Sequence, residues 1–356
     1  MSELTFHSDL EHLCRHVEIQ DSCFVIAGEE LPIEPTFDRL GLPSLEQEVQ
    51  NSMLESLSSR LYKAFYIRAL SKEEAASSSS LGITEAGVQR GEQDTDLVAQ
   101  LKLANGVAEA WDPGWQIYHF GNDGRAYVKR GDQSRIAWAG TYMLDTWMGS
   151  GAKIGDTVKL KVFPYTESSL DFFFHTFGAT LSDQFDEYKL LRFYFNVRAN
   201  AVVDLLRFLS AQLNHYLVPY HFKAIADCTL YDRADAAVLY VASCHYQIAA
   251  QILPSLPNLL GDGLRTAVPM FTRTWAPGIG AAQDPGNGAS FGLHRCRLVA
   301  QALLQAWAQQ TCSVEDKMDL IARSFTEAGI ALQAPYLNRG EYDIFAQPIF
   351  TGGVNR

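Results

Sequence analysis

The stretch 189–227, KLLRFYFNVRANAVVDLLRFLSAQLNHYLVPYHFKAIAD, decides the fold. KLLRFYFNV is short and rich in aromatic and aliphatic residues, which predicts a strand over 189–197. NAVVDLLRFLSAQLNHYL has apolar residues at spacings of three and four, which predicts an amphipathic helix over 200–217. VPYHFKAIAD (218–227) and AAVLYVA (236–242) predict two further strands. This order indicates a mixed sheet with helices packed on it, which is an α+β fold.

Downstream of these strands, the sequence predicts helices and one long loop. HYQIAAQILPSLPNLL, residues 245–260, predicts a helix interrupted by its two prolines, because proline lacks the N–H that a helix interior needs. HRCRLVAQALLQAWAQQ (294–310) and SVEDKMDLIARSFTEAGI (313–330) predict two more helices. The Gly- and Pro-rich segment 268–292, between the helices 245–260 and 294–310, predicts a loop of a length that usually serves function.

Upstream, the sequence predicts three regions. Residues 1–70 form a helical N-terminal region, and their apolar stripe favours packing on the main domain over a partner-binding arm; the stripe consists of Val49, Met53, Leu57, Leu61 and Ala64. Residues 71–98 are polar and Ser-rich, which predicts a flexible linker or insertion. Residues 99–356 form the α+β domain, whose part 111–165 predicts short strands separated by Gly-containing turns.

The composition limits the possible function classes. The chain has 356 residues, of which 47% are hydrophobic, and a formal net charge of -12. This composition excludes wholesale disorder, and the acidic balance disfavours nucleic-acid and membrane partners, which need a basic surface. The six cysteines form no C-x-x-C pair, and no signal peptide or long apolar run occurs. We therefore expect a soluble, cytoplasmic protein with reduced thiols.

Common catalytic motifs do not account for this sequence. The His294–Cys296 and Cys244–His245 pairs lack second pairs at ligand spacing, so we expect no metal site. No phosphate-binding glycine loop is complete. Ser290 lies in a G-x-S-x-G pattern that follows no predicted strand, which disfavours a serine hydrolase.

A set of cations lies on the predicted strands. Arg192 and Tyr194 alternate along the first strand, so both point to one face of the sheet. His221 and Lys223 alternate in the same way on the strand after the helix, and Arg233 lies shortly before the next strand. Cations in apolar strands are costly to bury without an anion. The set as a whole therefore predicts an anion-binding pocket.

Two further arginines, Arg273 and Arg295, bracket the long loop. For any single cation, a simple ion pair remains an equal alternative to the anion pocket. The candidate carboxylate partners for such a pair are Asp227, Asp232 and Asp235.

Three ordered segments carry a family resemblance. They are RFYFNVRANAVVDLLRFLSAQLN (192–214), VPYHFKAIADCTLYDRADAAVLYV (218–241) and VPMFTRTWAPGIGAAQDPGNGASFGLHRC (268–296). Together they resemble the HopA-type effector family, which includes type III effectors of plant pathogens and homologues in bacterial clusters that make class V lanthipeptides. The resemblance spans about residues 110–345. More remotely, the chain is similar to the phosphothreonine lyases of secreted bacterial effectors, which implies a phosphothreonine-lyase-like fold.

The resemblance also implies site residues. Arg192 falls on the first basic position of the phosphothreonine lyases, and Tyr194 stands where those enzymes have their acid histidine. The run FKAIAD, with Lys223, resembles their base motif with one spacing change, and Arg233 falls near their phosphate-binding arginine. The exchange of tyrosine for histidine leaves both Tyr194 and His221 as candidates for the general acid.

The activity implied is phosphate β-elimination from phosphoserine or phosphothreonine, giving dehydroalanine or dehydrobutyrine without a metal or an organic cofactor. Lys223 would be the base, and Arg192 and Arg233 would bind phosphate. Second-tier residues would be Arg273, Arg295 and Lys129 for phosphate, with Asp284 and Ser290 near the peptide. The implied partners are a phosphorylated precursor peptide, with leader and core, and a cognate kinase. The alternative is a non-catalytic phosphopeptide-binding or effector-type protein of the same fold.

Overall fold

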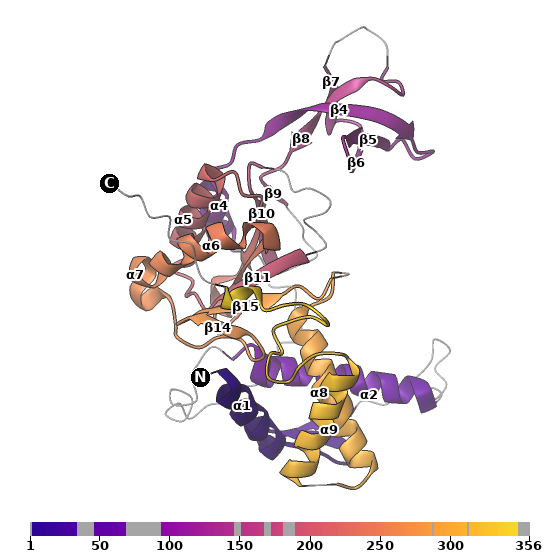
Figure 1. Cartoon of the computed structure of the whole chain (residues 1–356), viewed down its shortest axis with the longest axis vertical. Coiled ribbons are helices and arrows are strands. Elements are labelled where there is room, and N and C mark those ends of the chain that lie inside the picture. Colours follow the sequence, from indigo (N-terminus) through magenta and orange to yellow (C-terminus); the bar gives the residue numbers. More distant parts are fainter. Residues whose placement is uncertain are drawn as a thin grey trace.

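The fold is seen in a computed structural model of the chain, which describes residues 2–33, 46–68, 94–145, 151–166, 172–180, 189–286, 288–311 and 313–347. In these residues the strands form three antiparallel sheets, and helices pack around the largest (Figure 1). The predicted α+β class is therefore confirmed. Of the predicted linker, 71–98, residues 71–93 lie outside the described residues.

The central sheet has seven strands in the order β14-β15-β11-β13-β12-β10-β9. Their bounds are β9 (Tyr165–Thr166), β10 (Phe173–Phe177), β11 (Leu190–Phe195), β12 (His221–Ile225), β13 (Ala237–Ala242), β14 (Arg273–Ala276) and β15 (Ile279–Gln283). The three strands predicted around the central helix correspond to β11, β12 and β13. All of β13 is buried, as its unbroken apolar pattern predicts.

The hairpin of β14 and β15 lies inside the segment 268–292, so the prediction of a continuous loop is wrong there. Gly278 forms the turn with φ +74°, a conformation that favours glycine. A Cβ added at Gly280 would lie 2.5 Å from Thr272 Oγ1, so this strand needs a residue without a side chain. Strand β15, IGAAQ, thus consists of small residues with little strand propensity, and its sequence does not signal a strand.

Most predicted helices are present. The helices downstream of β11 are α5 (Val202–His215), α6 (Tyr246–Ile252), α7 (Leu256–Leu260), α8 (Phe291–Ala308) and α9 (Val314–Glu327). Ser313 caps α9 by accepting a hydrogen bond from the Asp316 N–H at 3.0 Å. Helix α4 (Thr95–Ala104) begins after its N-cap Asp94, four residues before the expected domain start, and packs on α5.

The N-terminal region packs on the main domain. It contains α1 (Ser2–His16), a small sheet of β1 (Val17–Ile19), β2 (Cys23–Ile26) and β3 (Glu29–Pro32), α2 (Glu46–Leu61), and a π-helical turn η1 (Tyr62–Tyr66). Helix α1 contacts α9, and α2 contacts α8 (Figure 1). Leu57 and Leu61 are fully buried in the main core, as the apolar stripe predicts. The three short strands were not predicted.

A separate five-stranded sheet lies at one end of the molecule (Figure 1). It consists of β4 (Ala110–Phe120), β5 (Ala126–Arg130), β6 (Gln133–Ala137), β7 (Tyr142–Leu144) and β8 (Thr157–Val162), in the order β6-β5-β4-β8-β7. It has its own small core around Trp115 and Ile117. The sequence predicts short strands within 111–165, and this sheet contains them.

In the described part of the chain, no helix has the length and apolar character needed to span a membrane.

Candidate functional site

One face of the central sheet gathers four of the predicted site residues. Arg192 of β11 pairs with Tyr240 of β13, which pairs in turn with His221 of β12. Two residues further along β11 and β12, Tyr194 and Lys223 both pair with Val238. Directly paired residues of adjacent strands point to the same face. The register therefore brings Arg192, Tyr194, His221 and Lys223 onto one surface.

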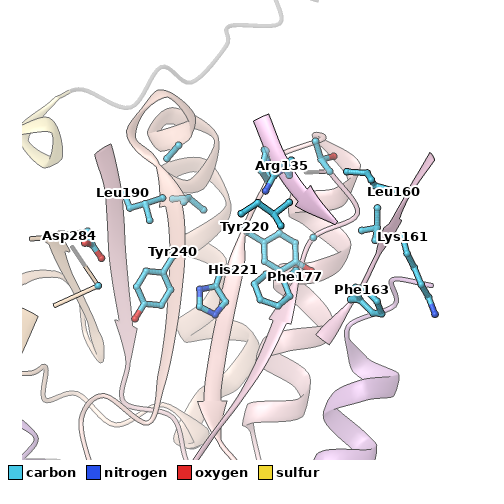
Figure 2. Close-up of a pocket in the computed structure, with 18 of the residues that line it drawn as sticks. Arg135, Leu160, Lys161, Phe163, Phe177, Leu190, Tyr220, His221, Tyr240 and Asp284 are labelled. Atoms are coloured by element: carbon cyan, nitrogen blue, oxygen red, sulfur yellow. The ribbon is translucent and has the colours of Figure 1, made fainter. Parts of the chain in front are cut away.

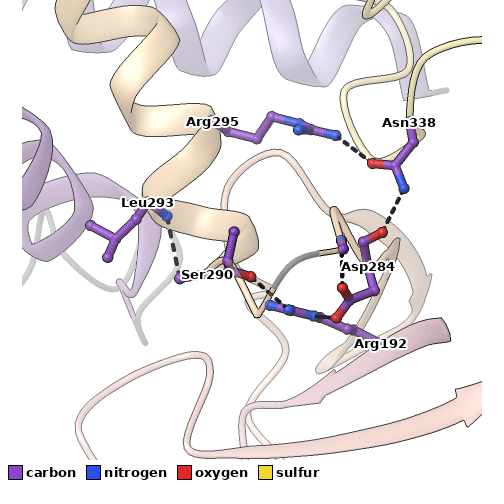
Figure 3. Close-up of polar contacts among 8 residues, drawn as sticks. Arg192, Asp284, Ser290, Leu293, Arg295 and Asn338 are labelled. Atoms are coloured by element: carbon purple, nitrogen blue, oxygen red, sulfur yellow. Dashed lines mark hydrogen bonds and ion pairs between the residues drawn. The ribbon is translucent and has the colours of Figure 1, made fainter. Parts of the chain in front are cut away.

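Arg192 lies at one end of this surface, in contact with the loop before α8 (Figure 3). Its Nε donates to Asp284 Oδ2 at 2.5 Å, and its Nη2 donates to the Ala289 carbonyl at 2.8 Å. The guanidinium also lies 5.1 Å from the centre of the Tyr240 ring. Burial by itself lowers the pKa of Arg192, but Tyr194, Tyr240 and Asp284 raise it by more, so Arg192 stays charged.

Tyr194 lies beside Arg192 and is 4% exposed. Its hydroxyl and that of Tyr66 are both buried, and neither has a hydrogen-bond partner among the described residues. The two rings meet edge to face with centroids 6.4 Å apart. Burial raises the pKa of Tyr194 and outweighs the lowering effect of Arg192.

Lys223 stands between the two arginine positions. Its Nζ lies 4.2 Å from the centre of the Phe173 ring and 5.8 Å from that of Tyr240. Among the described residues, no carboxylate forms an ion pair with it. Lys223 is thus held against aromatic faces, where a cation or a neutral amine packs without a fixed counter-ion.

Arg233 forms the other end of the surface in a closed polar cluster. Its Nε and Nη2 donate to the two carboxylate oxygens of Asp235 at 2.7 and 2.9 Å. The Tyr62 hydroxyl donates to the same carboxylate at 2.7 Å and accepts from Arg233 Nη2 at 3.1 Å. Burial by itself raises the pKa of Asp235, but Arg233, Tyr62 and Lys223 together lower it by more, so the carboxylate is charged. Of the candidate carboxylates, Asp235 is therefore the one that pairs with Arg233.

His221 lies in a row of stacked rings. Its ring packs between Phe177 and Tyr240, with centroids 4.9 and 4.8 Å away, and its Nε2 is 2.8 Å from His175 Nδ1. Burial lowers the pKa of His221 to about 3, with smaller effects from His175, Lys223 and Arg192. His221 is therefore neutral at pH 7, which weakens it as a proton donor.

The other predicted residues lie elsewhere. Arg273 Nη1 donates to Asp343 Oδ2 at 2.5 Å. Arg295 is completely buried in α8, where its Nε donates to the Pro335 carbonyl at 2.7 Å and its Nη2 to the Leu337 carbonyl at 2.8 Å. Lys129 belongs to the five-stranded sheet. Ser290 caps α8 (Figure 3).

A cleft of about 940 Å³ lies between the central sheet and the five-stranded sheet (Figure 2). On the side of the central sheet it is lined by Arg192, His221, Tyr240 and Asp284. The Arg192–Asp284 pair therefore borders this cleft, whereas Tyr194, Lys223 and Arg233 are not among its lining residues. Within the described ranges, no three His, Cys, Asp or Glu side chains gather in a group that could hold a metal ion.

Sequence reasoning missed the tyrosines that the N-terminal region supplies. Tyr62 and Tyr66 stack with centroids 4.9 Å apart, and the backbone holds them there through a bond from the Ala234 N–H to the Ile67 carbonyl at 2.8 Å. A Cβ added at Gly292 would lie 2.4 Å from Tyr66 Cε1, so α8 approaches this turn closely. The spacing of four in YKAFY places both rings on one helix side, but nothing local indicates where that side docks.

Comparison with known proteins gives one family match. Residues 167–337 match the model of the HopA1 effector protein family. The search of curated proteins finds no significant match.

The solved structures that are similar to this chain include two effector proteins of Pseudomonas syringae. The one from pv. tomato strain DC3000 has 10% identity and a TM-score of 0.47, and the alignment covers 95% of this chain and 99% of that chain. The one from pv. syringae strain 61 has 14% identity and a TM-score of 0.36, over 47% of this chain and 63% of that chain. The part of the chain that resembles the HopA1 effector protein family is thus residues 167–337, which include strands β10 to β15 of the central sheet.

Proposed function

We propose that this chain is a lyase that removes phosphate from phosphoserine or phosphothreonine by β-elimination, leaving dehydroalanine or dehydrobutyrine. Its substrate would be a ribosomally made precursor peptide that a cognate kinase has phosphorylated. The observation that supports the proposal is the position of Lys223, on one sheet face between Arg192 and Arg233 and without a carboxylate partner among the described residues.

In the proposed reaction, Lys223 in its neutral form takes the proton from Cα of the phosphorylated residue. The electron pair of that C–H bond forms the Cα=Cβ double bond, and the Cβ–O bond breaks with its electron pair leaving on the phosphate. Atoms and charge balance without a metal, an oxidant or water. The reaction needs a base, cations for the phosphate, and a proton donor for the leaving oxygen.

Two arginines can share the phosphate, although each already holds a carboxylate. Arg192 donates to its partners through Nε and Nη2, and so does Arg233. Among the described residues, neither Nη1 group has a hydrogen-bond partner. A guanidinium carries five N–H donors, so each arginine can bind a phosphate oxygen through Nη1 while its carboxylate stays in place.

Tyr194 suits the role of proton donor better than His221. Its hydroxyl carries a proton at neutral pH and lies on the same sheet face as Arg192 and Lys223, although burial raises its pKa and so makes it a weaker acid than an ordinary tyrosine. Tyr66 brings a second such hydroxyl to the same place. His221 is neutral and shares its Nε2 with His175.

The decisive test is a Lys223→Ala variant. We expect it to abolish elimination, seen by mass spectrometry as no loss of phosphoric acid from a phosphothreonine peptide. Binding of the same peptide should survive, because Arg192 and Arg233 remain. Lys159→Ala, on the five-stranded sheet and paired with Asp145 at 3.7 Å, is the matched control and should eliminate normally.

Full activity in Lys223→Ala would contradict the assignment of the base. A wild-type protein that binds the phosphopeptide and never releases phosphate would instead indicate the alternative, a non-catalytic phosphopeptide-binding protein of the effector type.

A further inference from the structure

The far wall of the cleft comes from the five-stranded sheet, which lies outside the family match that begins at residue 167. This wall is built by β6 and by the end of β8, and Figure 2 shows several of its side chains facing the central sheet. Its main contributors are Arg135, Ile136, Trp138, Lys161 and Phe163. The part of the molecule opposite the proposed site thus lies outside the matched residues.

Strand β6 borders the cleft with its backbone edge. It is the last strand in the order β6-β5-β4-β8-β7, so among the described strands it pairs only with β5. Residues 135–138 line the cleft consecutively. Successive side chains of a strand point to opposite faces, so consecutive lining residues indicate an edge rather than one face. An open edge of this kind accepts a further extended strand through main-chain hydrogen bonds.

The wall combines apolar groups with positive charge. Ile136 is 54% exposed, Trp138 is 53% exposed and Phe163 is 44% exposed. Arg125 lies 5.3 Å from the centre of the Trp138 ring and supports it from one side. Large side chains exposed together in a cleft are typical of a binding site rather than of plain surface.

The charge of the cleft differs from that of the chain. Its lining includes Arg135, Lys161 and Arg192 but, among the described residues, only Asp284 as an acid, although the whole chain carries a net charge of -12. Lys161 pairs with Glu109 at 2.9 Å and Arg192 with Asp284, but the cations that line the cleft still outnumber the acids that line it and favour an acidic ligand. The apolar groups between the cations fit a peptide better than a nucleic acid, which would need a continuous basic surface.

We infer that the five-stranded sheet holds the substrate peptide. The phosphorylated residue lies at the Arg192 end of the cleft. The residues beside it extend along the open edge of β6 and place apolar side chains against Ile136, Trp138 and Phe163. This inference rests on the proposed function for the position of the phosphate, but it assigns the recognition of the flanking residues to a different sheet.

The test compares long and short peptides. One synthetic library carries a central phosphothreonine with eight randomised residues on each side, a second carries one residue on each side, and a third is the long library without phosphate. Binding is measured with the Lys223→Ala protein, so that bound peptide is not consumed. We expect the long phosphorylated library to bind about tenfold or more tightly than the short one, the size expected for a central aromatic anchor.

Trp138→Ala should remove that advantage and leave the short library unaffected. Ile136→Asp provides a second, independent variant of the same wall. Trp111→Ala is the matched control, because Trp111 is 41% exposed on β4 of the same sheet and does not line the cleft. Equal binding of long and short peptides, or an equal loss in Trp111→Ala, would overturn the inference.

The unphosphorylated long library separates this inference from the proposed function. If no phosphopeptide undergoes elimination with the wild-type protein but the long library still binds in a Trp138-dependent way, the lyase proposal fails and the peptide cleft stands. If elimination proceeds equally from long and short peptides, the lyase proposal stands and the cleft inference fails.

Discussion

Two buried arginines, Arg192 and Arg295, show how the same side chain serves different purposes. Arg192 is 7% exposed, borders the cleft and is paired with Asp284. Arg295 is completely buried, and its guanidinium donates to main-chain carbonyls of the segment that follows α9; Figure 3 shows it reaching Asn338 of the same segment. Burial lowers the pKa of Arg295 to about 10, whereas the pKa of Arg192 is raised. A buried arginine becomes a candidate for ligand binding only where it reaches a cleft.

The largest expected effect is on turnover and concerns Tyr194, whose ring lies beside Arg192. Tyr194→Phe keeps the ring and removes the proposed acid, so we expect elimination to fall by about 10²–10⁴. Because the hydroxyl has no partner among the described residues, the free energy of unfolding should stay constant or rise slightly. Phosphate-release kinetics and urea unfolding measure the two effects.

Tyr66→Phe removes the neighbouring unpartnered hydroxyl and is the matched control. We expect it to lower turnover less than Tyr194→Phe. Normal turnover in Tyr194→Phe together with an inactive His221→Ala protein would move the acid role to His221.

The second effect is on stability and concerns Arg295. Arg295→Leu leaves the Pro335 and Leu337 carbonyls buried without their donors, so we expect the free energy of unfolding to fall by about 3–5 kcal/mol. Arg297→Leu is the control, because that side chain is 49% exposed and its ion pair with Glu55 is at the surface. It should change stability by less than about 1 kcal/mol. Thermal and urea unfolding compare the two variants. An Arg295→Leu protein as stable as the wild type would contradict the structural role of Arg295.

The third effect is on binding and concerns Arg192. The double variant Arg192→Gln with Asp284→Asn removes both charges and leaves no unpaired buried carboxylate. We expect phosphopeptide binding to weaken by about 1.5–3 kcal/mol, the size of a charge-assisted hydrogen bond. Calorimetric titration measures this loss, and an unphosphorylated peptide should bind as before. An equal loss for both peptides would show that Arg192 is structural, as Arg295 is.

The smallest effect is on the pH dependence of stability and comes from His221. Its pKa is about 3 in the folded protein, so below its unfolded value of 6.5 the unfolded chain binds a proton that the folded one does not. Stability is therefore complete above about pH 6.5 and falls toward pH 3, by at most about 1.4 kcal/mol per pH unit. His221→Phe keeps the stacked row and should flatten this slope in urea unfolding at pH 7 and pH 5. An unchanged slope would show that groups other than His221 cause the pH dependence of stability.

The elements that carry the site were predictable from local sequence. Alternation along KLLRFYFNV and VPYHFKAIAD places Arg192 with Tyr194, and His221 with Lys223, on one face of each strand. The two pairs meet because β13 lies between their strands, β11 and β12. Local periodicity does not determine how these three strands align with one another.

The remaining parts of the site depend on long-range packing. Arg273 and Arg295 bracket a segment whose middle forms a hairpin, and each bonds to the C-terminal segment instead of the sheet face. Tyr62 and Tyr66 reach the site only because α2 packs against α8. The charge state of His221 follows from its burial among neighbours that come from two other strands, β10 and β13.

The docking of the N-terminal turn has a consequence for how the protein matures. The bond between Tyr62 and Asp235 joins residues 173 positions apart, and Lys317 donates to the Val17 carbonyl across 300 positions. Closing such long segments costs entropy, and contacts of this kind slow folding. The cluster around Arg233 is therefore completed only when the turn that carries Tyr62 has docked beside Asp235, so a chain synthesised only as far as residue 234 has no complete cluster.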